Sequence, residues 1–226
     1  MKAIIFDAYG TLISTGTGSV DAAGRILARN GREDIPAKDF YARWKQLHRL
    51  HMDAPGEFVN EETIFHMDLR ALYAEFGFSR NADEDVELML ETLNNRAAFP
   101  ESREVLEHLG RDHVVCIGST TDSAPLMQNL ERNALRVHRV FTSEGLRTYK
   151  PRHEFYDSIL EQLKIPAHKA LFVGDSLADD VAGPQRVGMR ACWINRRGAA
   201  AGDFAPDYEI RDLRELFNIV YGRNDT

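Results

Sequence analysis

Short apolar runs alternate with longer amphipathic segments along most of the chain. The apolar runs are bounded by turn residues and are too short for helices, so they predict β-strands at residues 2–7, 113–118, 139–142, 170–174 and 190–195. The segments between them carry apolar positions at helical spacing, which predicts helices at residues 103–110, 124–133, 154–163, 178–187 and 213–221. This alternation is typical of an α/β fold in which a doubly wound, Rossmann-like parallel sheet is covered by helices on both faces.

The stretch from residue 15 to residue 98 lacks a strand pattern and shows only helical periodicity. Its predicted helices are separated by Gly, Pro and Asn and lie at residues 20–30, 37–51, 62–76 and 83–97. A helical block inserted after the first strand is expected to cap the carboxyl ends of the strands, where doubly wound sheets bind their ligands. The alternative is that it packs as a further layer. We therefore expect residues 1–14 and 99–226 to form a catalytic core and residues 15–98 an all-helical cap domain.

Composition and charge narrow the class of partner. Of the 226 residues, 43% are hydrophobic, which is enough for a sizeable core, and 35 Asp and Glu outnumber 28 Lys and Arg for a net charge of -7. Without a run of basic residues, this balance argues against nucleic acid or a membrane as partner and leaves a small anionic metabolite. Cys116 and Cys192 lie in apolar runs, which predicts buried thiols and a reducing, cytoplasmic location. The sequence does not indicate an oligomeric state.

An apolar strand runs directly into a carboxylate near the N-terminus, in the sequence Ile-Phe-Asp-Ala-Tyr-Gly-Thr-Leu from Ile5 to Leu12. Asp7 is thereby expected at the carboxyl edge of the sheet, surrounded by the amides of a glycine-containing turn. A carboxylate held there can act as a nucleophile when nearby positive charge stabilises the group that it attacks. The alternative is an Asp that caps a turn.

Another predicted strand ends in an acidic turn, Gly-Asp-Ser-Leu-Ala-Asp-Asp from Gly174 to Asp180. Three carboxylates this close repel one another unless they share a cation, and hard oxygen donors on a short turn suit Mg²⁺. One of them could instead cap the following helix, but a cap accounts for one acid and not for three.

Two further segments place polar side chains near strand ends. Ser119 and Thr120 follow the second predicted strand, where a hydroxyl can donate to an oxyanion, and Lys150 lies in the loop after the third. Taken singly, these are ordinary turn and surface residues. If the strands are correct, however, one sheet edge brings together the side chains that an active site requires, namely Asp7, Ser119, Lys150 and Asp175.

In the order in which they follow along the chain, these four segments resemble the four motifs of the haloacid dehalogenase superfamily of hydrolases with a helical, C1-type cap. With the inserted helices they account for nearly the whole chain. The resemblance implies that Asp7 is a nucleophile that forms a covalent aspartyl intermediate and that Lys150 neutralises Asp7 and the transferred group. It also implies that Ser119, with Thr120 beside it, binds that group, and that Thr11 supports the first turn.

The same resemblance implies a Mg²⁺ site formed by Asp7, the backbone carbonyl of Tyr9 and Asp175, completed by Asp179 or Asp180. The chain departs from the usual pattern at Tyr9, where phosphatases of this superfamily usually have a second Asp that protonates the leaving group and then activates water. A phenol with an ordinary pKa of about 10 is a poorer acid and base near neutral pH. Tyr9 therefore indicates either a slow phosphatase or a reaction that needs no proton on the leaving group.

Release of halide is such a reaction, and three patterns resemble the metal-independent 2-haloacid dehalogenases of the superfamily. Their first motif also reads Asp-Ala-Tyr-Gly-Thr, and Arg43 lies in a helix similar to the one that carries their carboxylate-binding arginine. The spacing of Lys150 and Tyr156 matches theirs as well. Against this, Asp175 stands in a segment where the dehalogenases carry Ser and Asn, and Thr120 replaces the Asn that receives the halide.

The acidic cluster decides between the two chemistries. Unpaired acids in a closed site are strongly destabilising, whereas a missing general acid reduces the rate by a factor of about 10² to 10⁴ without abolishing the reaction. The sequence thus predicts a Mg²⁺-dependent hydrolase that acts on a small phosphate monoester through an aspartyl intermediate. Two alternatives stay open: a metal-independent 2-haloacid dehalogenase, and a catalytically weak module that binds a phosphorylated metabolite.

Overall fold

The computed structural model describes residues 1–222, and in it the chain folds into two compact units. Unit 1 comprises Met1–Ser14 and the chain from Ala97 onward, and unit 2 comprises Thr15–Arg96. The chain re-enters unit 1 at Ala97 rather than at residue 99. It does so because the Ser14 N–H donates a hydrogen bond to the Ala97 carbonyl (2.8 Å) and the next residue bridges back to Ile13.

Unit 1 is built on a six-stranded sheet with the order β3-β2-β1-β4-β5-β6, in which every pair is parallel. The strands are β1 Ala3–Phe6, β2 Val114–Ser119, β3 Arg139–Thr142, β4 Ala170–Gly174, β5 Arg190–Ile194 and β6 Tyr208–Ile210. The five predicted strands are confirmed. The edge strand β6 was not predicted, because a run of three residues is too short to show a period.

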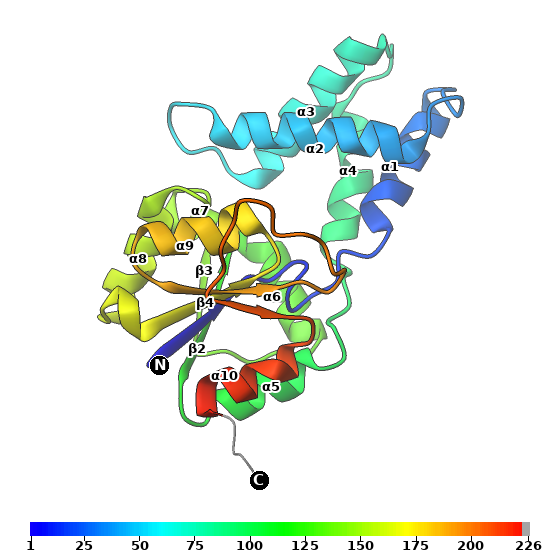
Figure 1. Ribbon diagram of the computed structural model, residues 1–226. Coiled ribbons are helices and arrows are strands. Elements are labelled where there is room, and N and C mark those ends of the chain that lie inside the picture. The colour runs from blue at the N-terminus through cyan, green and yellow to red at the C-terminus, as the bar shows by residue number, and fades with distance from the viewer. Residues whose placement is uncertain (223–226) are drawn as a thin grey trace. The chain divides into compact units, whose positions relative to one another are not determined.

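Helices cover both faces of the sheet (Figure 1). In unit 1 they are α5 Ser102–Leu109, α6 Ser123–Arg132, α7 Ser143–Leu146, α8 His153–Leu163, α9 Gly183–Arg186 and α10 Leu216–Tyr221, with a 3₁₀ turn, η1, at Ala167–Lys169. Ile4 and Phe6 of β1 pack in one buried cluster with α5, α6 and α10, whereas Ile5 packs in a second cluster with α8. Successive strand residues point to opposite faces, so β1 is buried on both sides.

Two predicted helices of unit 1 are wrong in form. The segment 178–187 is not one α-helix, because a π-helical turn, η2 (Leu177–Ala182), precedes the short α9. Pro184 lies in the first turn of α9 and has no backbone N–H to continue the α-helical ladder from η2. The segment 213–221 begins as a 3₁₀ turn, η3 (Leu213–Glu215), and only then continues as α10.

Unit 2 is helical throughout its regular elements, which are α1 Gly18–Arg29, α2 Ala37–Asp53, α3 Glu61–Phe76 and α4 Asp83–Leu93. Its core includes Phe40, Trp44 and Leu69. Helix α4 ends at Leu93 rather than at residue 97, because two asparagines follow and asparagine disfavours a helix interior. A doubly wound α/β fold with an inserted helical segment is thereby confirmed. Among residues 1–222, no helix has the length and apolar character needed to cross a membrane.

Candidate active site

The end of β1 lies where the strand order reverses. Strand β1 has β2 on one side and β4 on the other, and Phe6 pairs with Ile117 of β2 and with Val173 of β4. Asp7 therefore leaves the sheet at its carboxyl edge, where its N–H donates a hydrogen bond to the Val173 carbonyl (2.8 Å). Doubly wound sheets bind their ligands at this switch point.

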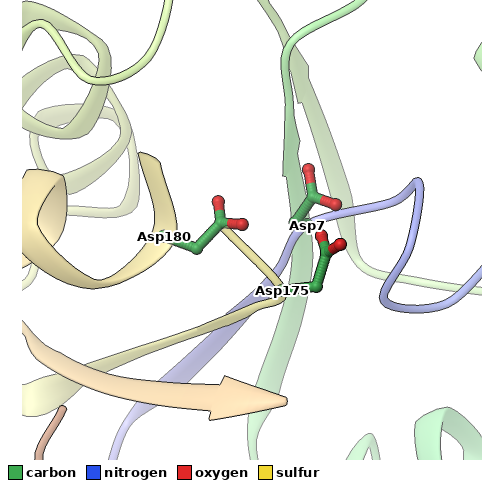
Figure 2. Close-up of side chains that lie close together, drawn as sticks. All are labelled: Asp7, Asp175 and Asp180. Carbon is green, nitrogen blue, oxygen red and sulfur yellow. The ribbon is translucent and has the colours of Figure 1, made fainter. Parts of the chain in front are cut away.

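Three carboxylates converge at this edge (Figure 2). Asp7 follows β1, Asp175 follows β4 and Asp180 lies in η2, and one carboxylate oxygen of each lies within 4.8 Å of the other two. Asp180 joins the cluster and Asp179 does not, because the turn is closed by the Ser176 N–H, which donates to Asp180 Oδ2 (3.0 Å). The structure thus brings three acids from two segments that are far apart in the chain around one point.

Lys150 lies between two of these acids and is almost completely buried. Its Nζ donates to Asp7 Oδ1 (2.8 Å) and to Asp180 Oδ1 (2.7 Å). Burial lowers the pKa of Lys150, but the charges of Asp180 and Asp7 raise it by more, so the ammonium group stays protonated. Lys150 supplies one positive charge against three carboxylates.

The carboxylates themselves are difficult to ionise together. Burial raises the pKa of Asp175 to about 6 and that of Asp180 to about 7, and it also raises the pKa of Asp7 above its ordinary value. Repulsion between the carboxylates contributes to these increases, while Lys150 opposes them. When all three acids are ionised, the cluster with Lys150 has a net charge of about −2, which a divalent cation would balance. The donor set of hard carboxylate oxygens fits Mg²⁺.

Two glycines make this close approach possible. Gly10 has a φ of 96° and lies directly against the Asp175 carboxylate, so that a β-carbon would collide with it. A β-carbon on Gly174 would likewise collide with the Asp180 side chain. The two turns therefore need glycine, for backbone conformation and space at Gly10 and for space at Gly174.

Hydroxyl groups line the same edge. Ser119 Oγ, at the end of β2, donates to Asp7 Oδ1 over 3.4 Å. The Thr120 and Thr11 hydroxyls are buried and have no hydrogen-bond partner among residues 1–222. Because a buried hydroxyl without a partner is unfavourable, that of Thr120, directly after Ser119, is a donor available to a bound oxyanion.

Tyr9 is engaged outside the carboxylate cluster. Its hydroxyl accepts a hydrogen bond from Asn129 Nδ2 of α6 (3.0 Å), and its ring packs against the buried cluster of that sheet face. Asn129 is itself fully buried and was not among the residues identified from the sequence. A signal was present, because Asn129 is a polar residue between Leu126 and Leu130 on the apolar face of α6.

Arg43 lies on α2 in unit 2 and is paired there. Its guanidinium forms a salt bridge with Glu75 (2.8 Å) and donates to Gln46 (3.2 Å). A substrate-binding role for Arg43 therefore stays a prediction. Tyr156 lies in unit 1 on α8, where its hydroxyl donates to the backbone carbonyl of Asp179 and so holds the η2 turn.

Two residues that support the site were not identified from the sequence. Trp193 of β5 donates from Nε1 to the Asp175 backbone carbonyl (3.0 Å), which fixes the start of the acidic turn. Arg196 donates to the Thr11 carbonyl (2.8 Å) and pairs with Glu101 (2.6 Å). Both act on the backbone of a motif from another part of the chain, which strand and helix patterns cannot show.

The chain has a doubly wound core with an inserted helical segment, and an aspartate, a lysine and an acidic turn lie at the switch point of its sheet. These features define a class of hydrolases with a doubly wound core. The family model of the haloacid dehalogenase-like hydrolases matches residues 1–188, and the chain belongs to this family.

Similar proteins of this family carry out different reactions. Pyrimidine 5'-nucleotidase PynA of Streptococcus pneumoniae is 25% identical over 97% of this chain and 94% of its own length. (S)-2-haloacid dehalogenase 4A of Burkholderia cepacia is 26% identical over 97% of this chain and 95% of its own. These similarities therefore support hydrolysis without selecting the substrate.

The putative HAD-hydrolase YfnB of Bacillus subtilis shows both a sequence and a structural likeness. The sequence match is 35% identical but spans only 36% of this chain and 35% of that protein. A crystal structure of YfnB bound to magnesium superposes with a TM-score of 0.80 at 22% identity, over 97% of this chain and 98% of that one. At this identity the superposition supports the fold alone.

Proposed function

We propose that this protein is a Mg²⁺-dependent phosphatase that hydrolyses a small phosphate monoester through a covalent intermediate on Asp7. The observation that carries the proposal is the convergence of Asp7, Asp175 and Asp180 within 4.8 Å, with only Lys150 between them. This charge excess would repel an anionic substrate in a site without metal, whereas a divalent cation balances it.

The proposed reaction assigns one role to each side chain of the edge. An Asp7 carboxylate oxygen bonds to phosphorus, and the bond from phosphorus to the ester oxygen breaks; water then cleaves the aspartyl phosphate and releases inorganic phosphate. Lys150 and the hydroxyls of Ser119 and Thr120 hold the phosphoryl oxygens. Mg²⁺, bound by the three acids and the Tyr9 carbonyl, would supply the positive charge that lets an anion approach Asp7.

Tyr9 limits this activity. The departing alkoxide needs a proton, and a phenol supplies it poorly near neutral pH. We therefore propose that esters with a good leaving group are hydrolysed readily and alkyl esters slowly. The 2-haloacid dehalogenase reaction is the second candidate, because halide leaves without a proton and a dehalogenase is among the similar proteins.

Two parallel assays test the proposal. The first measures phosphate release from p-nitrophenyl phosphate with Mg²⁺ and with a chelator, because its leaving group needs no protonation. The second measures chloride release from 2-chloropropionate in the presence of the chelator. We expect turnover in the first assay that requires the metal, and none in the second.

The other outcomes each support a different function. Chloride release that is unaffected by the chelator would contradict the phosphatase proposal and support a dehalogenase function. If neither substrate is turned over but inorganic phosphate binds in the presence of Mg²⁺, the protein is a module that binds a phosphorylated metabolite.

A further inference from the structure

Two arginines follow the last two strands of the sheet, β5 and β6. Arg197 lies in the loop after β5, and β5 pairs with β4, whose end carries Asp175. Arg211 directly follows β6, which pairs with β5. In a parallel sheet the carboxyl ends of neighbouring strands lie at one edge, so both arginines are on the edge that carries the proposed site.

The Arg211 guanidinium also lies beside the loop that carries Arg197. A β-carbon on Gly198, the residue after Arg197, would lie 3.7 Å from a terminal nitrogen of Arg211. Both arginines are exposed, and among residues 1–222 neither guanidinium forms a hydrogen bond or an ion pair. This sets Arg197 apart from its neighbour Arg196, whose guanidinium is held by Glu101 and by the Thr11 carbonyl.

The charge of Arg197 reaches the acidic cluster. Arg197 is close enough to Asp175 for the two opposite charges to interact. Lys150 is committed to Asp7 and Asp180 through its two short ion pairs. Arg197 therefore adds positive charge beside the cluster that is not neutralised by an acid of the protein.

We propose that Arg197 and Arg211 form a binding site for a second anionic group of the substrate, next to the phosphate ester that Asp7 attacks. This rests on the proposed phosphatase function and adds the class of substrate to it. A guanidinium has five N–H donors in a fork that matches a carboxylate or a phosphate, and two guanidinium groups on neighbouring loops without acid partners favour the binding of an anion.

Three substrates with the same carbon chain test this site. They are the phosphate ester of 3-hydroxypropionate, the matching ester of 3-hydroxypropionamide, and the bisphosphate of 1,3-propanediol. The carboxamide is the neutral reference, because it has the size and shape of the carboxylate without its charge. The measured quantity is kcat/KM for each anionic ester divided by kcat/KM for the amide ester, with Mg²⁺ present.

We expect this ratio to be about 10 for at least one anionic ester in the wild type, mainly through a lower KM. Arg197→Gln should reduce the ratio to about 2 or less, and Arg211→Gln should reduce it partly. The ratio should also fall as NaCl is added, because the two arginines are exposed. A higher ratio for the carboxylate identifies a carboxylate as the second group, and a higher ratio for the bisphosphate identifies a phosphate.

Arg186→Gln is the matched control. Arg186 is exposed at the end of α9, just before β5 begins. Its replacement therefore removes the same charge near the opposite edge of the sheet. It should leave the ratio unchanged. A wild-type ratio near 1, or an equal loss in the Arg186 and Arg197 variants, would overturn the proposed site.

The binding of the three esters separates this proposal from the proposed function. If the wild type hydrolyses neither these esters nor p-nitrophenyl phosphate with Mg²⁺, the phosphatase proposal fails, and calorimetric affinities of the wild type and the Arg197 variant give the same ratio without catalysis. Tighter binding of an anionic ester that is lost with Arg197 then supports the site. Equal affinities for all three esters would contradict it.

Discussion

At the scale of single residues, we expect the position of Tyr9 to determine which esters the proposed phosphatase can cleave. Asn129 holds the Tyr9 hydroxyl, and the ring packs into the sheet face that α6 covers. The side chain thus contributes packing where a carboxyl group would contribute a proton. This separates the two steps of the proposed reaction, because attack by Asp7 does not need Tyr9 whereas departure of an alkoxide needs an acid.

Replacing Tyr9 by Asp should therefore change the reaction selectively. We expect Tyr9→Asp to raise kcat for an alkyl phosphate about 10- to 100-fold and to leave p-nitrophenyl phosphate within about threefold, because only the first needs a general acid. Tyr9→Phe is the control, since it keeps the ring and removes the hydroxyl. An unchanged or lower kcat for the alkyl ester would count against Tyr9 standing at the acid position.

The individual residues of the site differ in how far the sequence could predict them. Asp7, Ser119 and Asp175 each end or directly follow a strand, so a correct assignment of strands already places them at one edge. The choice between Asp179 and Asp180 was not predictable, because it depends on η2 being a π-helical turn. Asn129, Trp193 and Arg196 act across the fold on backbone or side chains of other segments, and no local pattern marks them.

At the scale of elements, helices α2 and α3 are joined by a buried carboxylate. Asp68 of α3 is completely buried and accepts a hydrogen bond from Trp44 Nε1 (3.1 Å). Its two carboxylate oxygens also contact His48 Nδ1 (2.7 Å) and His51 Nδ1 (2.6 Å) of α2. Burial lowers the pKa of His48, but hydrogen bonds with Asp68 and Glu61 raise it by more, to about 9. His48 is therefore protonated in the folded protein at neutral pH.

This raised pKa predicts a loss of stability in alkali. The folded pKa of His48 is about 9 and its ordinary value is 6.5, so its contribution is complete below pH 6.5 and disappears as the pH rises to 9. The linkage amounts to up to about 3 kcal/mol. Urea unfolding between pH 6 and pH 9 should show this decline in the wild type and not in His48→Gln.

His51→Gln serves as the control for that measurement. It removes another contact with Asp68 from the same helix and leaves His48 in place. The decline should persist in this variant. A wild-type curve parallel to that of His48→Gln would contradict the assignment to His48.

Regular periodicity explains which elements could be predicted. The strands β1 to β5 and the longer helices show clear periods, and they appear where the sequence indicates them. The failures are η2 with α9, where a proline interrupts a helical pattern, η3, which replaces the start of a predicted helix, and β6 and α7, which are too short to show a repeat. Pairing of β6 with β5 is a tertiary effect that no short run of residues encodes.

At the scale of the whole molecule, we expect the acidic cluster to link metal binding to the stability of unit 1. Three acids held around one point destabilise the folded state while they share only Lys150. A bound cation converts this repulsion into attraction. The chain should therefore gain stability on binding Mg²⁺ and lose that gain when an acid of the cluster is removed.

Thermal unfolding measures this gain. At Mg²⁺ a hundredfold above its Kd, binding adds about 2.7 kcal/mol, which raises Tm by about 5 to 10 °C for a chain of this size. Asp175→Asn should be more stable than the wild type without metal, because one repelling charge is gone, and should show almost no response to Mg²⁺. An equal rise of Tm in both proteins would show that Mg²⁺ binds elsewhere.

Turnover by Asp7→Asn tests whether Asp7 forms the proposed covalent bond to the substrate. Hydrolysis of p-nitrophenyl phosphate with saturating Mg²⁺ is compared between the wild type and this variant, whose amide keeps the size of the side chain and loses the nucleophile. We predict a loss of kcat of at least about 10³-fold. An Asp7→Asn protein that keeps a tenth or more of wild-type turnover would contradict it.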